Sequence, residues 1–293
     1  MDMVLQQIIN GLTLGIIYAL VAVGYSLVFG ILRLINFSHG SVYAFGAHIS
    51  MLFIGFNFGL VPAITASVVI TGLLGVFIDK TGLEPLRKKK SKGISALITT
   101  IGISYIIQNL LMIVFGSQTK FFPKLFDYGN FTVAGTVVGI RQIVIFAIAL
   151  LLLAVLTFVV NHTKVGLAMK AIEQNQKAAH LMGINVNSVI TFTFFLGGSS
   201  AAIAGTLIAG YYQMVYPVMG FMVGLKAFAA AVLGGIGILY GSIIGGLFIG
   251  LSETFAATYL GGSYRDAIAF LILIIVLLFK PSGLFGKKTI TKV

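Results

Sequence analysis

The sequence contains no cysteine and very little charge. Without cysteine, a disulfide framework and thiolate-ligated metal sites are excluded. Only 9% of the 293 residues are charged, whereas a soluble domain carries about a quarter. Hydrophobic residues make up 58% of the chain, and the mean hydropathy is +1.07. The chain therefore cannot cover a globular surface with polar groups, and most of it must lie in a lipid bilayer.

Common catalytic motifs are also missing. No G-x-x-x-x-G-K-[ST] motif occurs, so the chain does not hydrolyse ATP at a Walker site. There is no H-E-x-x-H motif, no convincing Ser/His/Asp set, and no second His or acid at metal-ligand spacing from His39. We therefore expect a non-enzymatic chain with no catalytic residue, no metal and no cofactor.

Nine apolar runs approach the length of about 20 residues that a membrane-spanning helix needs. They predict an all-α fold, a single domain over residues 1–293 built as a polytopic transmembrane bundle of about 8–9 spans. The second run begins with polar residues, and the seventh could be a re-entrant segment. The first is too long for a signal peptide, so we expect it to be a membrane helix. The runs are 4–29, 42–59, 61–78, 94–115, 142–160, 189–211, 219–237, 242–260 and 267–279.

Lysine and arginine gather in three segments, 80–92, 162–180 and 280–292. The positive-inside rule predicts that all three face the cytoplasm, and that the N-terminus and the 116–141 loop face outside. This alternation favours nine crossings over eight. The net charge of +12 then reflects topology and anionic lipid, with no nucleic-acid partner. Several tyrosines are expected at the outer interface, namely Tyr211, Tyr212, Tyr216, Tyr259 and Tyr264.

Glycines repeat every four residues in two parts of the chain. Such spacing creates a smooth strip on one face of a helix, where two backbones can approach closely. We expect packing within the chain rather than a dedicated dimerisation site. The repeats are Gly11 with Gly15, Gly237 with Gly241 and Gly245, and Gly246 with Gly250.

The segment 163–185 predicts an amphipathic helix outside the membrane. Thr163 suits an N-cap, Gly183 suits the left-handed residue after a C-terminus, and Glu173 with Lys177 forms an i,i+4 pair. The helix either lies passively at the membrane interface or docks on a soluble partner. Its small apolar residues and mixed charges favour a protein groove. The apolar stripe comprises Val165, Ala168, Met169, Ile172, Ala179 and Met182.

Polar residues within the apolar pattern are the second clue to function, because they are costly in a bilayer. Asn36, Ser38 and His39 break the pattern between the first two runs, which requires a cavity or a protein environment there. Lys226 and Glu253 lie inside the seventh and eighth runs. They either pair to hold the bundle together or take part in transport.

Several motifs in order resemble the permeases of bacterial branched-chain amino-acid ABC importers, most closely the LivH type. The resemblance covers nearly the whole chain, and the urea and short-chain amide permeases look similar. The motifs are NGLTLGIIYALVAVGY at 10–25, INFSHG at 35–40, GIN at 183–185, AG at 204–205, GLKAF at 224–228, AVLGGIG at 231–237 and LFKPSGL at 278–284.

This resemblance implies an importer in the bacterial inner membrane, driven by ATP. Its partners would be a second permease, two cytoplasmic ATPases and an extracytoplasmic binding protein that delivers a small amino-acid-like solute. The 163–185 segment would be the coupling helix, with contacts at Glu173, Ala178, Ala179, Gly183 and Ile184. The translocation path would involve Asn36, Ser38, His39, Lys226 and Glu253. The alternatives are a urea or amide permease, or an ion-coupled transporter with Glu253 as the proton carrier.

Overall fold

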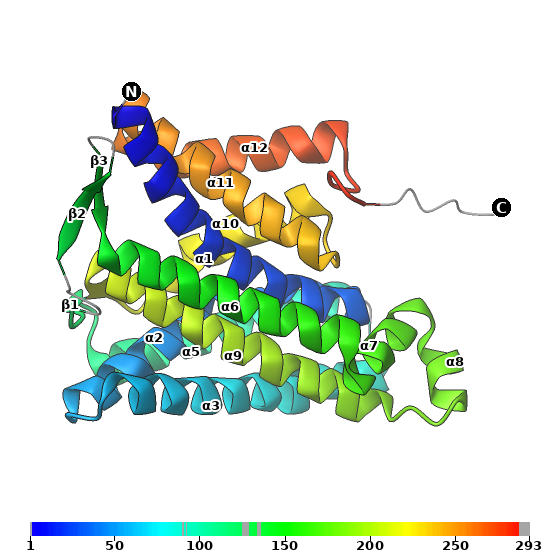
Figure 1. Ribbon diagram of the computed structural model, residues 1–293. Helices are drawn as coiled ribbons and strands as arrows, with labels where there is room; N and C mark the ends of the chain where they lie inside the picture. The colour runs from blue at the N-terminus through cyan, green and yellow to red at the C-terminus, as the bar shows by residue number, and fades with distance from the viewer. Residues whose placement is uncertain (1, 90, 92, 125–128, 134–135, 287–293) are drawn as a thin grey trace.

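The computed structural model describes residues 2–286 except 90, 92, 125–128, 134 and 135. Long helices lie side by side in one bundle, as Figure 1 shows. They are α1 (Asp2–Leu32), α2 (His39–Gly55), α3 (Leu60–Ile78), α5 (Gly93–Phe115), α6 (Ile140–His162), α9 (Val186–Tyr212), α10 (Met219–Gly234), α11 (Leu239–Tyr259) and α12 (Arg265–Phe279). The short helical elements are the π-helical turn Asp79–Leu83, α4 (Glu84–Lys88), α7 (Lys164–Gln174), α8 (Gln176–Leu181) and the 3₁₀ turn Gly262–Tyr264.

All nine apolar runs fold as helices, so the expected polytopic helical bundle is confirmed. In the described part of the chain, seven helices are long and apolar enough to cross a membrane. The other two are α2, with 17 residues, and α10, with 16. These correspond to the two irregular runs of the sequence. Short helices leave backbone at membrane depth that is not helical, which is tolerated where protein or a cavity surrounds it.

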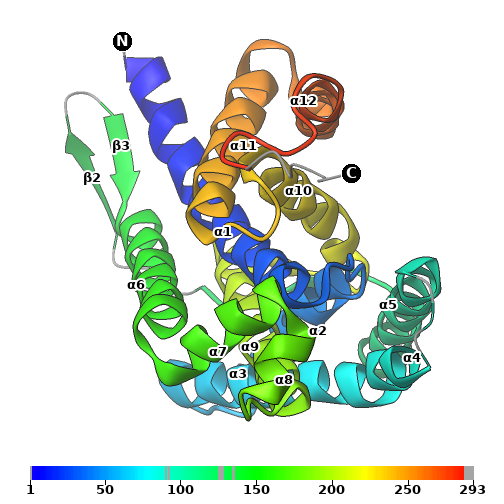
Figure 2. The same cartoon turned by 90° about the vertical axis from the view of Figure 1, so that its right-hand side faces the viewer.

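The two ends of the bundle carry different structures. At one end lie the N-terminus and the small sheets, in which β1 (Lys120–Phe121) pairs with β4 (Met214–Val215), and β2 (Asn130–Val133) with β3 (Thr136–Gly139). At the other end lie α7, α8 and the last turn of α12 (Figures 1 and 2). The described parts of the basic segments gather at this second end, as the charge pattern predicts. Lys90, Lys92 and residues 287–293 lie outside the described residues.

Glycines let α1 and α11 pack in direct backbone contact. A Cβ atom added to Gly246 would collide with the backbone of Ala19, and one added to Gly250 with the backbone of Gly15. Gly245 is equally close to the carbonyl group of Ala230 on α10. The expected packing of the glycine repeats within the chain is therefore confirmed. It leaves α1 at the centre, with 89% of its most apolar stretch buried.

The expectation of one continuous helix over 164–182 is wrong. The chain breaks at Asn175, whose backbone is extended at φ −158° and ψ 107°. Its side-chain oxygen accepts hydrogen bonds from the backbone N–H groups of Lys177 and Ala178, at 3.0 and 3.1 Å. An asparagine can thus cap a new helix instead of continuing the old one. Glu173 and Lys177 consequently lie on different helices, and the expected i,i+4 pair does not exist.

Both ends of this segment agree with expectation. Thr163 caps α7 by accepting the backbone N–H of Gly166 at 3.2 Å. Gly183 has a φ of +85°, and the hydrogen bonds that end α8 run from Gly183 to His180 and from Ile184 to Ala179. This is a Schellman motif, which places a left-handed residue after the last turn.

Candidate functional site

A non-helical turn of six residues joins α1 to α2 within the bundle. It starts at Arg33, which adopts a left-handed φ of 52°. The side-chain oxygen of Asn36 accepts hydrogen bonds from the Ser38 backbone at 3.1 Å and the Ser38 hydroxyl at 2.6 Å. The backbone N–H of Phe37 donates to Thr100 of α5 at 3.2 Å. Side chains thus replace the missing helical hydrogen bonds, so this break is a built feature of the fold.

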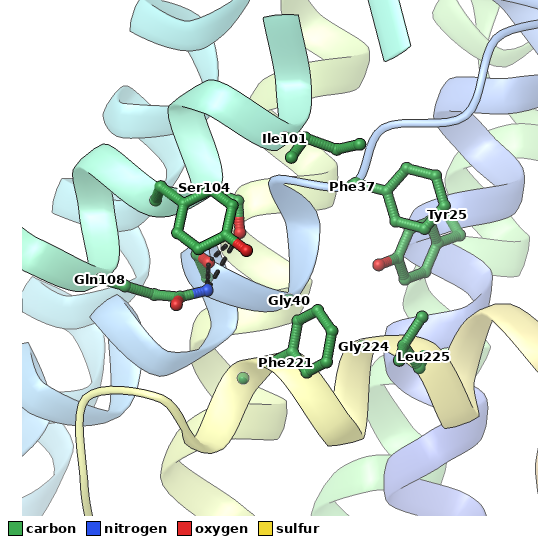
Figure 3. Close-up of a pocket in the computed structure, with 12 residues that line it drawn as sticks. Tyr25, Phe37, Gly40, Ile101, Ser104, Gln108, Phe221, Gly224 and Leu225 are labelled. Atoms are coloured by element: carbon green, nitrogen blue, oxygen red, sulfur yellow. Dashed lines mark hydrogen bonds between the residues drawn. The ribbon is translucent and has the colours of Figure 1, made fainter. Parts of the chain in front are cut away.

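The break borders a cavity of about 280 Å³, which we call the aromatic cavity. Figure 3 shows Tyr25 and Phe37 on one side, Ser104 and Gln108 of α5 on the other, and Phe221 of α10 below. Tyr105 and Phe221 are more than half exposed, so the cavity opens between α5 and α10. The complete lining is Tyr25, Phe37, Gly40, Ser41, Ile101, Ser104, Tyr105, Gln108, Gly220, Phe221, Gly224 and Leu225.

The polar groups of the aromatic cavity satisfy one another. The hydroxyl groups of Ser41 and Ser104 lie 2.6 Å apart. The side-chain amide of Gln108 donates to both of them at 3.1 Å (Figure 3). No charged residue is among the described residues that line it. The arrangement suits passage of an apolar group past a neutral polar strip, and it lacks a partner for an ion.

A second cavity, of about 420 Å³, lies against the opposite face of α10, and we call it the charged cavity. Met219, Val223 and Lys226 face this cavity, whereas Gly220 and Gly224 face the aromatic one. Helix α10 is therefore the wall between the two. The complete lining is Tyr18, Tyr43, Ile208, Tyr212, Met214, Tyr216, Met219, Met222, Val223, Lys226, Glu253, Arg265 and Asp266.

Four ionised side chains form a compact cluster in the charged cavity. The Lys226 ammonium group lies 3.0 Å from a Glu253 carboxylate oxygen and 2.5 Å from one of Asp266. Arg265 donates to the same Glu253 oxygen, and the Tyr18 hydroxyl donates to it at 3.1 Å. Lys226 and Glu253 therefore pair, which was one of the two expectations for them. Pairing compensates part of the large cost of burying each charge.

Two buried polar atoms on residues that line the charged cavity lack partners among the described residues. The second carboxylate oxygen of Glu253 and the hydroxyl group of Tyr43 are buried and make no hydrogen bond among the described residues. Both side chains are 0% exposed. Buried polar atoms are nearly always paired, so unpaired ones that line a cavity need a physical explanation.

At the end of the bundle where α8 lies, the 163–185 segment is attached to the C-terminal end of α1. The Gln176 side chain donates to the carbonyl group of Ile31 at 3.1 Å, and Arg33 donates to the Glu173 carbonyl group at 3.4 Å. Partial desolvation raises the pKa of the Glu173 carboxyl group, while the charges of Arg33 and Lys170 act in the opposite direction. The segment thus holds the residues that start the break beside the aromatic cavity.

The outer surface of the segment is unusually apolar. Leu167, Leu181 and Met182 are 71%, 85% and 83% exposed. Ala178 and Gly183 are exposed, but Ala179 is only 4% exposed and packs into the core. Of the five residues expected to contact an ATPase, Ala179 therefore faces the interior of its own chain.

The expected path residues do not all lie together. Lys226 and Glu253 line the charged cavity, whereas Asn36, Ser38 and His39 line neither cavity. His39 is 3% exposed and packs against the Tyr25 ring, with ring centroids 4.7 Å apart, in a space that Gly24 leaves open. The role of these residues in transport stays a prediction.

Sequence reasoning overlooked several residues of the two cavities. Arg265 and Asp266 directly precede the last apolar run, where charges are common and attract no attention. Tyr212, which is expected at the outer interface, accepts a hydrogen bond from Arg265. Tyr43 and Phe37 stand among many similar apolar residues. One signal in the sequence could have revealed this cluster: the charges near the outer ends of the last two apolar runs are of opposite sign and could pair.

Known proteins resemble this chain over its whole length. The family model described as "Branched-chain amino acid transport system / permease component" matches residues 7–277. The permease BraD of a high-affinity branched-chain amino acid transport system in Pseudomonas aeruginosa is 38% identical, covering 99% of this chain and 98% of its own. LivH of Escherichia coli K12, described in the same terms, is 39% identical, covering 99% of this chain and 97% of its own. A ribose import permease, RbsC of Haemophilus influenzae, is 27% identical, covering 97% of this chain and 87% of its own.

Proposed function

The chain belongs to the family of permease components of branched-chain amino acid transport systems, and on this premise we propose that it is the membrane subunit of an ATP-driven importer for branched-chain amino acids. It would act with a second permease, two cytoplasmic ATPases and an extracytoplasmic binding protein in the bacterial inner membrane. The relatives BraD and LivH are named as permease proteins of high-affinity branched-chain amino acid transport systems. The ribose permease is less similar, which favours an amino acid as the solute.

The observation that carries the proposal is the attachment of the 163–185 segment to the end of α1. An ATPase that binds the exposed face of α7 and α8 would move the Gln176–Ile31 and Arg33–Glu173 contacts with it. Those contacts lie at the start of the break at residues 33–38, which contributes Phe37 to the aromatic cavity. Docking outside the membrane would thus reach the cavity through a single short element. Such a link fits a permease whose energy comes from another subunit.

Substitutions on the exposed face of the segment test the proposal. Ala178→Trp should overfill a close-packed docking contact, and mismatches of this kind typically cost about 1–3 kcal/mol. Gly183→Val should strain a backbone with φ of +85°. Both sites have open space around them in this chain, so the permease should still fold. Ala178→Ser, which hardly changes the volume, is the matched control.

The readouts are membrane abundance, co-purification of the ATPase subunits, and ATP-driven uptake of L-leucine. We expect normal abundance, lost association and lost uptake for the first two variants, and none of these losses for Ala178→Ser. Unchanged association and uptake in both variants would refute docking at this segment. Ala179→Trp is unsuitable because Ala179 packs inside the chain.

An ion-coupled transporter with Glu253 as proton carrier fits the structure less well. Lys226 and Arg265 both contact the Glu253 carboxylate, so this side chain is held in two ion pairs. A carrier must accept and release a proton during each cycle. Uptake that stops on addition of an uncoupler, with ATP held constant, would support this alternative.

A further inference from the structure

The charged cavity has the chemistry of an amino-acid site. Its four ionised side chains are two cations and two anions, so their charges sum to zero. A zwitterion matches such a site because it brings one charge of each sign and leaves the balance unchanged. We propose that this cavity holds the ammonium and carboxylate groups of a hydrophobic amino acid on its way through the permease. This inference rests on the proposed function and adds a substrate site to it.

The two unpartnered atoms are the contacts that we assign to the ligand, and because both are closed off from the cavity in this structure, their side chains must turn to meet it. The free carboxylate oxygen of Glu253 is a hydrogen-bond acceptor only, and it suits the α-ammonium group of the ligand. The Tyr43 hydroxyl group can donate to the α-carboxylate, which the cations of Lys226 and Arg265 also attract. A bound zwitterion would thereby satisfy the two polar atoms that the described part of the chain leaves unpaired. This accounts for their burial without partners.

Apolar side chains complete the site. Ile208, Met219 and Val223 line the cavity beside the charged cluster and can surround an aliphatic side chain. Methionines adapt readily to ligands of differing shape. The volume of about 420 Å³ lies within the usual range for small-molecule sites. Met214 and Met222, both 43% exposed, and the partly exposed Asp266 mark the side from which a solute can enter.

The aromatic cavity does not offer the same chemistry. Its hydroxyl and amide groups already bond to one another, and its described lining carries no charge. Moving a zwitterion into such surroundings would strip both charges of water without replacing the lost interactions. Of these two cavities, the charged one is therefore where the ammonium and carboxylate groups can find partners.

Binding of tritiated L-leucine to the full-length purified permease in lipid nanodiscs tests the site directly. L-valine should compete with it. L-leucinol, which lacks the carboxylate, and 4-methylpentanoate, which lacks the ammonium group, should compete at least about tenfold less well, because each leaves buried charges unpaired. Equal competition by all three compounds would overturn a site for a zwitterion.

Two variants with matched controls locate the site. Tyr43→Phe removes a hydroxyl group that bonds to none of the residues the structure describes, so folding should be unaffected, while L-leucine binding weakens about tenfold or more. Tyr105→Phe makes the same change at the aromatic cavity and should have no effect. Val223→Phe should weaken L-leucine more than L-alanine by narrowing the apolar wall. Leu225→Phe, on the other face of α10, should not discriminate between them.

The outcomes separate this inference from the importer itself. Two results would overturn the site and leave the proposed function standing, provided that the whole complex takes up L-leucine. One is the absence of saturable binding to the permease, and the other is binding by Tyr43→Phe and Val223→Phe that is indistinguishable from wild type. Loss of binding in the Tyr105→Phe and Leu225→Phe controls instead would place the ligand in the aromatic cavity and also overturn it. Absence of L-leucine uptake by the whole complex would refute the proposed function.

Discussion

Removing one charge from the Lys226–Glu253 pair should destabilise the permease more than removing both. Truncating one partner of a buried ion pair costs about 3–5 kcal/mol, because the other charge stays behind unpaired. Glu253 is fully buried, and Lys226 is 5% exposed. Glu253→Gln leaves Lys226 and Arg265 with Asp266 alone, a net charge of +1 in the cluster. Lys226→Met leaves the net charge at −1.

The structure places both costs at or below the lower end of that range. Lys226 keeps its contact with Asp266, and the Arg265 side chain, 31% exposed, retains some water. We therefore expect the free energy of unfolding to fall by about 3 kcal/mol for Glu253→Gln and about 2 kcal/mol for Lys226→Met. The double variant keeps one cation and one anion, so its loss should be only about 1–2 kcal/mol instead of the additive ~5.

The assay is denaturation of the detergent-solubilised permease by SDS, followed by circular dichroism. Lys80→Met is the control. It breaks the pair between Lys80, whose side chain is 47% exposed, and Glu84, and it should lower the free energy of unfolding by less than about 1 kcal/mol. Additive losses in the double variant would refute the coupling between Lys226 and Glu253. Near-zero losses in both single variants would show that the cluster does not stabilise the bundle.

Three further predictions concern other parts of the chain. Cysteines introduced at Ser91 and Ser117 in this cysteine-free protein should react with an impermeant maleimide from opposite sides of the membrane, and labelling from one side would contradict the topology. Gly246→Leu should sharply reduce the folded yield on size-exclusion chromatography, because its Cβ would collide with the backbone of α1. Gly102→Leu, which has open space around its Cα, should not, and equal yields would show that the α1–α11 contact is dispensable. Glu173→Gln should leave the thermal stability of the isolated permease at pH 7 unchanged or slightly raised. The raised pKa of Glu173 means that the fold disfavours the ionised carboxylate, which is the form present above that pKa. A clear loss of stability would show that the fold favours the ionised form.

Particular residues show where sequence reasoning reached its limit. Gly183 was expected to be left-handed, and it is, because the Schellman motif depends on a few consecutive residues. Asn175 lies inside the single helix that the 163–185 pattern predicts, although its side chain can equally cap a new helix. Choosing between these two local states depends on packing elsewhere, and in the bent segment both Ala179 and Met169 are buried against the rest of the chain. Propensity alone does not contain that information.

The two cavities illustrate the same limit. Lys226 and Glu253 stood out because an isolated charge in an apolar run is conspicuous. Their partners Arg265 and Asp266 sit at the edge of a run, where charge carries no cost. The aromatic cavity was not expected at all, since Tyr25, Phe37 and Phe221 are distant in sequence and each resembles its apolar neighbours.

Composition, apolar run length and the placement of lysine and arginine by themselves determined that this chain is a helical membrane protein with about 8–9 apolar runs in a defined order. These properties follow from the transfer of residues between water and lipid, which depends on residue type and local sequence. Only the tertiary structure decided that α10 separates two cavities, that Glu253 shares its carboxylate with Lys226, Arg265 and Tyr18, and that the 163–185 segment attaches to the start of the break. Those features depend on how closely helices approach and rotate against one another, and that is set by contacts between residues far apart in the chain.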